Sequence, residues 1–272
     1  MYYSKIGNKG SGLTNQIFAL ITSIIIAYRK KENIIVVDNF LNDFSKQSFT
    51  PISLIINLEE LNNFLKKYKI IIIDKESSAE HKNKNYIHTF GWINKYDIRM
   101  FEDILINIKY NISYIEKSTL ILSDKVNNSK INIIHLRIED DAIKHWSKMN
   151  NATEGFFKQY LEKKYIKLIE KYISKEDTNI ILSSSLNNTV IDFLSANSYN
   201  YVFNNKYFEG REQNAIVDLL SSKLCNNIFI GNYNPVRQRG SSFSYYISKM
   251  IKAKKIFIDL DSIYEIEYII NA

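Results

Sequence analysis

Residues 132–138 read Asn-Ile-Ile-His-Leu-Arg-Ile, and this apolar stretch opens the most regular part of the chain. After it, short apolar runs alternate with segments whose apolar residues recur at helical spacing. The runs predict strands at 132–138, 179–183, 199–203, 227–231 and 255–259. The spaced segments predict helices at 156–172, 187–196, 213–224 and 241–251, with a polar loop before the first of them, to about residue 153. Such alternation is typical of a parallel sheet with helices on both faces.

The first half of the chain shows a less regular version of the same pattern. Strands are expected near 2–6, 33–37 and 69–74, and helices at 15–31, 58–68, 96–105 and 112–125. The polar run Asn127-Asn-Ser-Lys130 separates the two halves. The predicted fold class is therefore α/β, with two facing Rossmann-like domains at residues 1–126 and 127–272. In such folds ligands bind at the carboxyl ends of the strands.

Composition excludes several classes of protein. Of the 272 residues, 45% are hydrophobic and 24% are charged, which is ordinary for a soluble globular protein. Cys225 is the single cysteine, so neither an intrachain disulfide nor a four-cysteine zinc site can form. The longest apolar run, 17–27, falls short of the ~20 residues of a membrane span, and the N-terminus has no signal-peptide pattern. We expect a cytoplasmic protein without an integral membrane segment.

The basic balance favours an anionic ligand only weakly. Lysine and arginine number 36 against 29 acidic residues, and the excess is spread over both halves. No DNA- or RNA-binding module is recognisable, so we expect no nucleic-acid partner. Arginine is scarce in this lysine-rich chain, and four of the six arginines follow residue 136: Arg137, Arg211, Arg237 and Arg239. The planar guanidinium binds phosphate through two hydrogen bonds, which lysine does not.

Three segments combine scarce residues with a place between a strand and a helix. The first is the glycine-rich loop Gly10-Ser-Gly-Leu-Thr-Asn-Gln16, whose backbone amides and following helix N-terminus favour an anion. The second is His135-Leu-Arg137, in which the two polar side chains lie two residues apart on a strand and are expected on one face. The third, 231–244, ends in Ser241-Ser-Phe-Ser244 and opens a helix.

Each segment also has a structural interpretation. Single glycines often serve only in tight turns, and an ordinary helix cap is the alternative role of Ser241 or Ser242. Arg137 has possible internal partners in Glu139, Asp140 and Asp141. An unpaired buried guanidinium would cost several kcal/mol, so it requires either such a partner or an anionic ligand such as a diphosphate.

Further short motifs complete an ordered set along the chain. It consists of Gly12-Leu-Thr-Asn15-Gln16-Ile-Phe18, Phe90-Gly-Trp92, Phe101-Glu-Asp103, His135-x-Arg137, and Asp218 with Cys225, 227–231 and Ser241-Ser-Phe-Ser244. The set resembles the inverting fucosyltransferases of the two-Rossmann GT-B fold. It looks most like the bacterial-type α-1,2-fucosyltransferases of glycosyltransferase family 11, and more distantly like the protein O-fucosyltransferases. Departures include Thr14 before Asn-Gln, Arg137-Ile-Glu-Asp140 in place of Arg-Arg-Gly-Asp, and Ser183-Ser-Ser185 in place of Ser-Asp-Asp.

The resemblance implies GDP-fucose as the donor substrate, a glycan as the acceptor, inversion at the anomeric carbon and no other cofactor. Arg137, His135 and Asn15 are the implied catalytic residues. Implied substrate contacts are Gly12, Gln16, Ser184, Ser185, Asp218, Ser241, Ser242 and Phe243. Glu139, Asp140 and Asp141 are candidates for the general base.

Two alternatives stay open from the sequence. The first is a transferase that uses another GDP-sugar or a protein acceptor. The second is a nucleotide-sugar-binding protein without turnover. No metal is expected: Asp259-Leu-Asp261 matches a short metal-binding pattern of transferases with another fold, but such triplets are common. His81, His88 and His145 form no spacing typical of a metal site.

Overall fold

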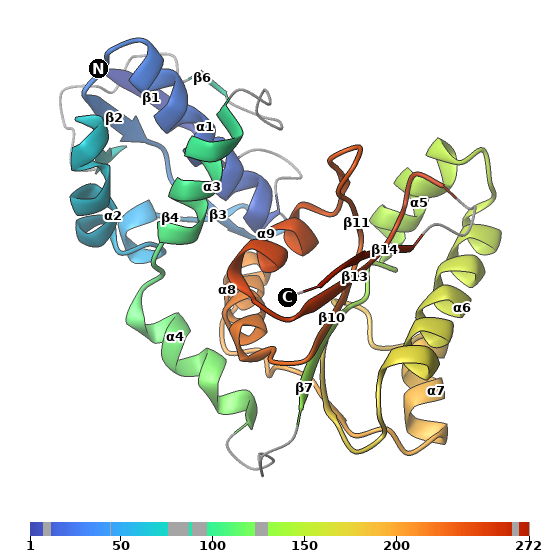
Figure 1. Ribbon diagram of the computed structural model, residues 1–272. Helices are drawn as coiled ribbons and strands as arrows, with labels where there is room; N and C mark the ends of the chain where they lie inside the picture. Colours follow the sequence, from blue (N-terminus) through green and yellow to red (C-terminus); the bar gives the residue numbers. More distant parts are fainter. Residues whose placement is uncertain are drawn as a thin grey trace. The chain divides into compact units, whose positions relative to one another are not determined.

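The computed structural model describes residues 1–7, 12–43, 45–75, 87–88, 97–122, 130–262 and 267–271, with only the backbone of 87–88 and 122 (Figure 1). Contacts divide the chain into two units. Unit 1 contains Met1–Lys117 and Lys206–Val217, and unit 2 contains Ser118–Asn205 and Asp218–Ala272. Each unit has its own parallel sheet.

Unit 1 has a four-stranded sheet in the order β5-β2-β1-β6. The strands are β1 (Tyr2–Lys5), β2 (Ile34–Val37), β5 (Ile71–Asp74) and β6 (Ile87–His88), and all neighbours are parallel. In chain order this is 3-2-1-4, the arrangement of half a Rossmann fold. The strand order therefore reverses at β1, whose end leads into the glycine-rich loop.

The longest helix of unit 1 is buried on most of its surface. α1 (Leu13–Arg29) is apolar around nearly its whole circumference, and such a helix is stable only inside a core. The ring of Phe18 meets that of Phe101 edge-on at 5.0 Å, which packs α1 against α3 (Ile98–Asn107). The remaining elements are the antiparallel hairpin β3 (Phe40–Asp43) and β4 (Ser48–Thr50), α2 (Leu58–Leu65), α4 (Ile112–Thr119), and the 3-10 turns η1 (Ile52–Leu54) and η2 (Lys66–Tyr68).

Unit 2 has a six-stranded sheet in the order β14-β13-β10-β7-β8-β9. Its strands are β7 (Ile131–His135), β8 (Thr178–Leu182), β9 (Tyr201–Val202), β10 (Ile228–Gly231), β13 (Lys254–Ile258) and β14 (Glu267–Ile270). The first five are parallel, and β14 is antiparallel to β13. In chain order the parallel strands run 3-2-1-4-5, the Rossmann order, so the strand order reverses at β7.

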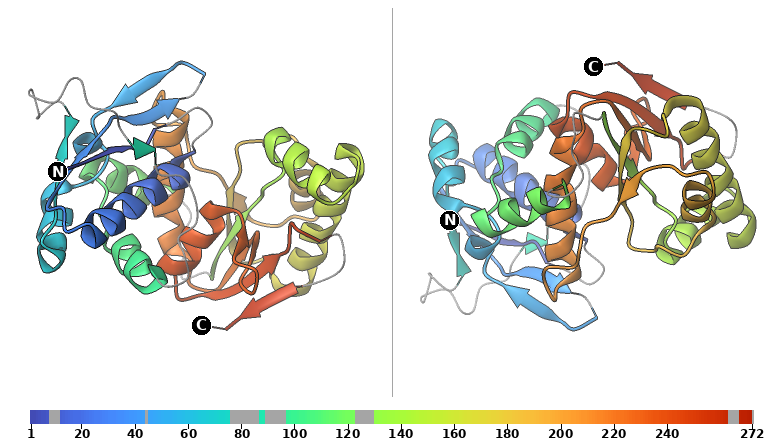
Figure 2. Two further views of the ribbon diagram at one scale, coloured as in Figure 1. Left: turned by 90° about the horizontal axis from the view of Figure 1, so that it is seen from above. Right: turned by 90° about the horizontal axis from the view of Figure 1, so that it is seen from below.

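Helices cover both faces of this sheet (Figures 1 and 2). On one face lie α5 (Asp140–Met149), α6 (Glu154–Tyr172) and α7 (Thr189–Ala196), and on the other lie α9 (Ser242–Met250) and the end of α8 (Arg211–Ser221). The core under α6 joins Ile134, Ile181 and Ile230 of the strands to Phe157 and Tyr165, all almost fully buried. The hairpin β11 (Tyr233–Asn234) and β12 (Arg239–Gly240) and the turns η6 (Leu120–Leu122) and η7 (Ser222–Leu224) complete the unit.

The predicted strands and helices of both halves are present, with ends shifted by a few residues. The polar loop expected before residue 153 is wrong, because α5 occupies 140–149. Its apolar face is narrow, with Ala142 and Ile143 buried, and acidic Asp140 and Asp141 begin it, where they favour a helix N-terminus. The antiparallel β14 and the two hairpins were not predicted.

The predicted division at 126/127 places residues 206–217 in the second domain, whereas in the structure they pack with unit 1. The Phe208 ring lies 4.7 Å from the Tyr114 ring, and the Gln213 amide donates to the Tyr114 hydroxyl at 3.1 Å. Some predictions lie outside the described residues. These are Gly10, the segment 90–92, His81, the side chain of His88, the helix end at 123–125 and the boundary itself. Within the described residues no helix has the length and apolarity required to cross a membrane.

Candidate active site

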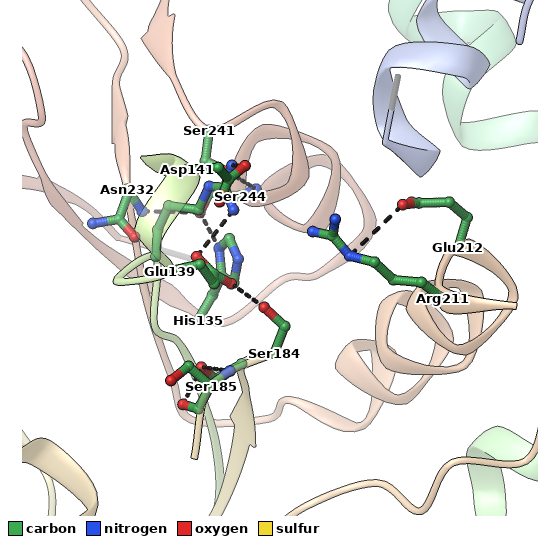
Figure 3. A network of polar contacts seen from close by, with 12 residues as sticks. His135, Glu139, Asp141, Ser184, Ser185, Arg211, Glu212, Asn232, Ser241 and Ser244 are labelled. Atoms are coloured by element: carbon green, nitrogen blue, oxygen red, sulfur yellow. Dashed lines mark hydrogen bonds and ion pairs between the residues drawn. The ribbon is translucent and has the colours of Figure 1, made fainter. Parts of the chain in front are cut away.

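Polar residues of unit 2 collect where β7, β8 and β10 end. His135 closes β7, Ser183 to Ser185 follow β8, and Asn232 follows β10. These three strands are parallel neighbours, so their carboxyl ends lie at one edge of the sheet. The strand order reverses at β7, and such a switch point is where open α/β sheets bind ligands. Figure 3 shows the side chains here.

His135 is held from two sides. Its Nδ1 lies 2.7 Å from Oγ of Ser244, and its ring centroid lies 5.0 Å from that of Phe243. The residue is only 6% exposed, and burial lowers the pKa of His135 to about 4. The imidazole is therefore neutral near pH 7, so it has one N–H donor and one acceptor nitrogen. Phe243, an implied substrate contact, packs on this imidazole in the structure.

Arg137 follows β7 rather than lying in it, which corrects the expected strand to residue 138. Its backbone N–H donates to the hydroxyl of buried Tyr165 at 3.0 Å. Its guanidinium donates to Oε2 of Glu139 at 2.9 Å and to Oδ2 of Asp141 at 3.2 Å. The internal ion pairs considered from the sequence are therefore present. Asp141 is 63% exposed, so that pair is weak and exchanges readily with solvent or another anion.

Glu139 connects the ends of two strands. One carboxylate oxygen accepts from Arg137, and the other accepts from the hydroxyl of Ser184 at 3.1 Å. Both oxygens are engaged, so Glu139 holds the guanidinium of Arg137 and joins it to Ser184. Ser185 lies in a turn in which Oγ of Ser183 accepts its N–H at 3.2 Å and donates to its carbonyl at 2.8 Å. Ser184 is exposed, and Ser185 is half-buried.

The N-terminus of α9 lies beside His135. Ser241 is the N-cap, and its Oγ accepts the backbone N–H of Ser244 at 3.4 Å, which confirms the predicted cap. Ser242 begins the helix, and the first turn contains no acidic residue. In contrast, Asp140 and Asp141 occupy the first turn of α5. Helix N-termini favour anions, so of these two α9 is the better site for a phosphate.

Asp218 lies on α8 at the start of the second segment of unit 2. Its Oδ1 accepts from the side-chain amide of Asn204 at 2.8 Å. Part of the residue reaches the surface, yet burial of the carboxyl raises the pKa of Asp218 to about 6. A carboxylate with so few internal donors can accept hydrogen bonds from a ligand.

The anion site predicted in unit 1, the N-terminus of α1, already binds a carboxylate of the protein itself. Oε2 of Glu212 accepts the N–H of Leu13, the first residue of α1, at 2.5 Å. Gly12 is the N-cap with φ −66°, and the one described residue that a Cβ there would meet is Glu212, at 3.6 Å. The backbone at Gly12 therefore does not require glycine. A ligand phosphate would have to share this helix end with a carboxylate.

Gln16 has a structural role that differs from the predicted substrate contact. It is fully buried, its amide donates to the carbonyl of Leu41 at 2.9 Å, and its Oε1 accepts the N–H of Leu41 at 2.8 Å. These bonds fix β3 against α1. Asn15, one residue earlier, is half-buried in the first turn of α1, and its catalytic role stays a prediction.

The Asp259-Leu-Asp261 motif is used locally. Asn234 donates to Oδ2 of Asp259 at 2.7 Å, and the backbone N–H of Asp261 donates to its Oδ1 at 2.9 Å. Among the described residues, no group of three or more histidine, cysteine, aspartate or glutamate side chains could hold a metal ion. His145, expected in a loop, is exposed on α5.

Sequence reasoning missed Glu212, which binds the N-terminus of α1 in unit 1, and three residues that build the edge of the sheet in unit 2: Tyr165, Asn232 and Ser244. The last was quoted in the Ser-Ser-Phe-Ser motif but received no role. The hydroxyl of Tyr165 lies 2.7 Å from the carbonyl oxygen of His135 as well as accepting from Arg137, so it fixes the backbone between them. A tyrosine on a helix, far along the chain, carried no local signal for this contact.

Comparison with solved structures identifies proteins of the same fold. The crystal structure of POFUT1 in complex with GDP-fucose aligns with a TM-score of 0.59 at 8% identity, over 92% of this chain and 93% of that one. Fucosyltransferase NodZ from Bradyrhizobium aligns with a TM-score of 0.61 at 11% identity, over 99% and 98%. NodZ α-1,6-fucosyltransferase soaked with GDP-fucose aligns with a TM-score of 0.53 at 13% identity, over 99% of both chains.

This chain has the two-domain α/β fold of those enzymes. The predicted GT-B fold class is thereby confirmed, and the alignments span nearly the whole length of both proteins. No protein-family model matches the sequence, and no curated protein matches it.

Proposed function

We propose that this protein is a glycosyltransferase that moves fucose from GDP-fucose to a glycan hydroxyl, with inversion and without a metal ion. The observation that carries the proposal is the edge at the switch point of unit 2, where neutral His135, the guanidinium of Arg137 and the N-terminus of α9 gather. Positive or hydrogen-donating groups at this place suit a diphosphate. Three structures of the same fold carry fucosyltransferase names or bound GDP-fucose.

The proposed donor site uses each group differently. The backbone amides at the start of α9, with Ser241 and Ser242, bind phosphate oxygens. His135 donates to a phosphate or to the ribose. Arg137 keeps its bond to Glu139 and exchanges its weaker, exposed partner Asp141 for the β-phosphate.

In the reaction the acceptor hydroxyl oxygen attacks the anomeric carbon, and the bond from that carbon to the β-phosphate oxygen breaks. The electron pair of the broken bond stays on GDP, whose negative charge grows as the bond stretches. The guanidinium of Arg137 stabilises this charge more in the transition state than in the ground state. The hydroxyl proton passes to a base. Asp140 and Asp141 are the exposed candidates among the three considered, because Arg137 keeps its bond to Glu139 and releases Asp141 when the donor binds.

The guanine base is assigned to Asp218. Its carboxylate accepts the N1–H and the exocyclic N–H of guanine, whereas uracil and cytosine offer no such pair of adjacent donors to one carboxylate. Ser184 and Ser185 are further nucleoside contacts. Asn15 of unit 1 and Gly12 are assigned to the sugar side of the reaction, in line with the resemblance of their motif.

The motif set favours the α-1,2 linkage, while a structure of the same fold is named as an α-1,6 enzyme. Methylation analysis of the fucosylated product decides between them. A 2-substituted acceptor sugar supports the α-1,2 assignment, and a 6-substituted one contradicts it.

A thermal-shift screen of nucleotide sugars tests the donor. Ligand at ~100-fold over Kd stabilises a protein by ~2.7 kcal/mol. GDP and GDP-fucose should raise the melting temperature, and UDP- and CMP-sugars should not. A response to GDP-mannose equal to that of GDP-fucose would favour another GDP-sugar as donor, and a response to UDP-sugars alone would refute the proposal.

A non-catalytic nucleotide-sugar-binding protein is the second candidate, favoured by the two carboxylates already paired with Arg137. Release of free fucose from GDP-fucose without acceptor separates the two candidates. Slow hydrolysis supports the transferase, and a thermal shift without any hydrolysis or transfer supports the binding protein.

A further inference from the structure

A short chain of hydrogen bonds runs from β10 through α9 to β7. The backbone N–H of Asn232, just after β10, donates to Oγ of Ser244 at 2.9 Å. The same oxygen lies 2.7 Å from Nδ1 of His135 (Figure 3). All three residues are buried, with Ser244 and Asn232 fully so. Buried polar groups of this kind must satisfy one another, because water cannot do so.

Counting protons fixes the direction of these bonds. A serine hydroxyl has one proton and two lone pairs, and one lone pair of Ser244 accepts from Asn232. Its proton requires an acceptor, and within the described part of the chain the one at hydrogen-bond distance is Nδ1 of His135. Nδ1 must then be unprotonated. A neutral imidazole keeps its single proton on the other nitrogen, Nε2.

We infer that Ser244 is a positioning residue that fixes His135 as the tautomer protonated at Nε2. No partner of Nε2 is present among the described residues. The second part of the inference rests on the proposed function: Nε2–H donates a hydrogen bond to the donor diphosphate or ribose. In the opposite tautomer a lone pair of Nε2 would face the phosphate oxygens and repel them.

The surrounding sequence is built for this contact. A Cβ on Gly231 would lie 2.9 Å from Oγ of Ser244 and 2.6 Å from the ring of Phe229, so only glycine lets α9 come this close to β10. Ser241 fixes the turn of α9 that contains Ser244, through its cap bond. Phe243 holds the imidazole ring from the other side.

Nitrogen-15 NMR of the histidine rings in the full-length protein, without nucleotide, tests the first part. His135→Gln assigns the signal. In the wild type, Nε2 of His135 should be protonated and Nδ1 unprotonated. Ser244→Ala should shift the Nδ1 signal and give a mixture of tautomers, and Ser244→Thr should restore the wild-type pattern. Ser248→Ala is the control, because the hydroxyl of Ser248 donates to the carbonyl of Tyr245 within the same helix.

A wild-type spectrum with protonated Nδ1 overturns the inference, and this measurement stands even if Ser244→Ala fails to fold. Unchanged ring nitrogens in a folded Ser244→Ala variant overturn it as well. GDP titration tests the second part: Kd should rise ~3–10-fold in Ser244→Ala, as expected for one oriented hydrogen bond, and remain unchanged in Ser248→Ala. A wild type that shows the Nε2–H tautomer but binds no GDP refutes the proposed function while leaving the role of Ser244 intact.

Discussion

Glu212 on α8 places its carboxylate on the first backbone N–H of α1, that of Leu13, at 2.5 Å. These two residues are 199 positions apart in the sequence. The contact explains why residues 206–217 belong to unit 1. It also means that the glycine-rich loop leads to a helix end whose anion is supplied by the protein itself.

Replacing Glu212 should therefore destabilise the fold. A buried carboxylate at a helix N-terminus contributes ~1–2 kcal/mol. Glu212→Ala should lower the free energy of unfolding by about that amount in urea denaturation, and Glu212→Gln should lose less because it keeps an acceptor. Exposed Glu209→Ala is the control and should change stability by less than ~0.5 kcal/mol. Equal losses in the two alanine variants would refute this role.

Gly231 is expected to be intolerant of a side chain. An added Cβ would approach Phe229 and Ser244 to within 3 Å, so Gly231→Ala should destabilise the protein by ~1–3 kcal/mol through overpacking. Gly155 lies in the first turn of α6, and no atom of the described residues comes within 4 Å of such a Cβ there. Gly155→Ala should instead stabilise by up to ~1 kcal/mol, since alanine is the better helix former. Thermal denaturation of both variants checks the contrast, and a neutral Gly231→Ala contradicts it.

Asp218 should make stability and nucleotide binding respond to pH in opposite ways. Burial raises the pKa of its carboxyl to about 6, so the folded state retains the proton at a pH where the unfolded chain has lost it. Its contribution to the free energy of unfolding therefore falls as pH rises from about 4 to 6, by roughly 2–3 kcal/mol at 1.36 kcal/mol per pKa unit. GDP affinity should rise over the same range, because guanine needs the ionised carboxylate.

Asp218→Asn separates these effects. The variant should be more stable than the wild type at pH 7, bind GDP more weakly and lose the pH dependence of binding. Calorimetric titration with GDP at pH 5 and pH 7.5 measures the difference. Unchanged GDP affinity in a stabilised variant would remove Asp218 from the nucleotide site.

Glu139 and Asp141 should differ although both bind Arg137. Glu139 is 13% exposed and also bonded to Ser184, whereas Asp141 is 63% exposed. Glu139→Gln should lower the turnover of GDP-fucose by ~10-fold, because a charged hydrogen bond that orients the guanidinium is lost. Asp141→Asn should change it less than ~3-fold. A larger loss in Asp141→Asn would reverse the assigned roles.

The regular part of the fold could be predicted from the sequence because its signals are local. Buried parallel strands such as 131–135 are continuous apolar runs, and α6 has a long apolar stripe. The spacing of apolar residues could not distinguish α5 from a loop, because this helix has only ten residues and buries three of them. The residues of the edge strand β14 are half-buried or exposed, so its sequence lacks the continuous apolar run of a buried strand.

Of the candidate site, the sequence identified the residues that are chemically unusual for their surroundings. His135 and Arg137 stand out among isoleucines, and Ser241 precedes a helix. The residues that orient them, such as Ser244 and Tyr165, are ordinary in type and act through contacts between elements far apart in the chain. Gln16 is the opposite case. Its place in the motif suggested a ligand contact, but in the structure its side chain hydrogen-bonds to the backbone of β3.

Turnover of GDP-fucose by Arg137→Ala tests the central claim most directly, that this guanidinium stabilises the charge developing on the leaving diphosphate. The control is Arg29→Ala, which removes another ion-paired arginine, in unit 1. The Arg137→Ala variant should remain folded, still respond to GDP in the thermal shift, and lose ~10²-fold or more in turnover, while Arg29→Ala keeps wild-type activity. Near-normal turnover in Arg137→Ala would contradict the account.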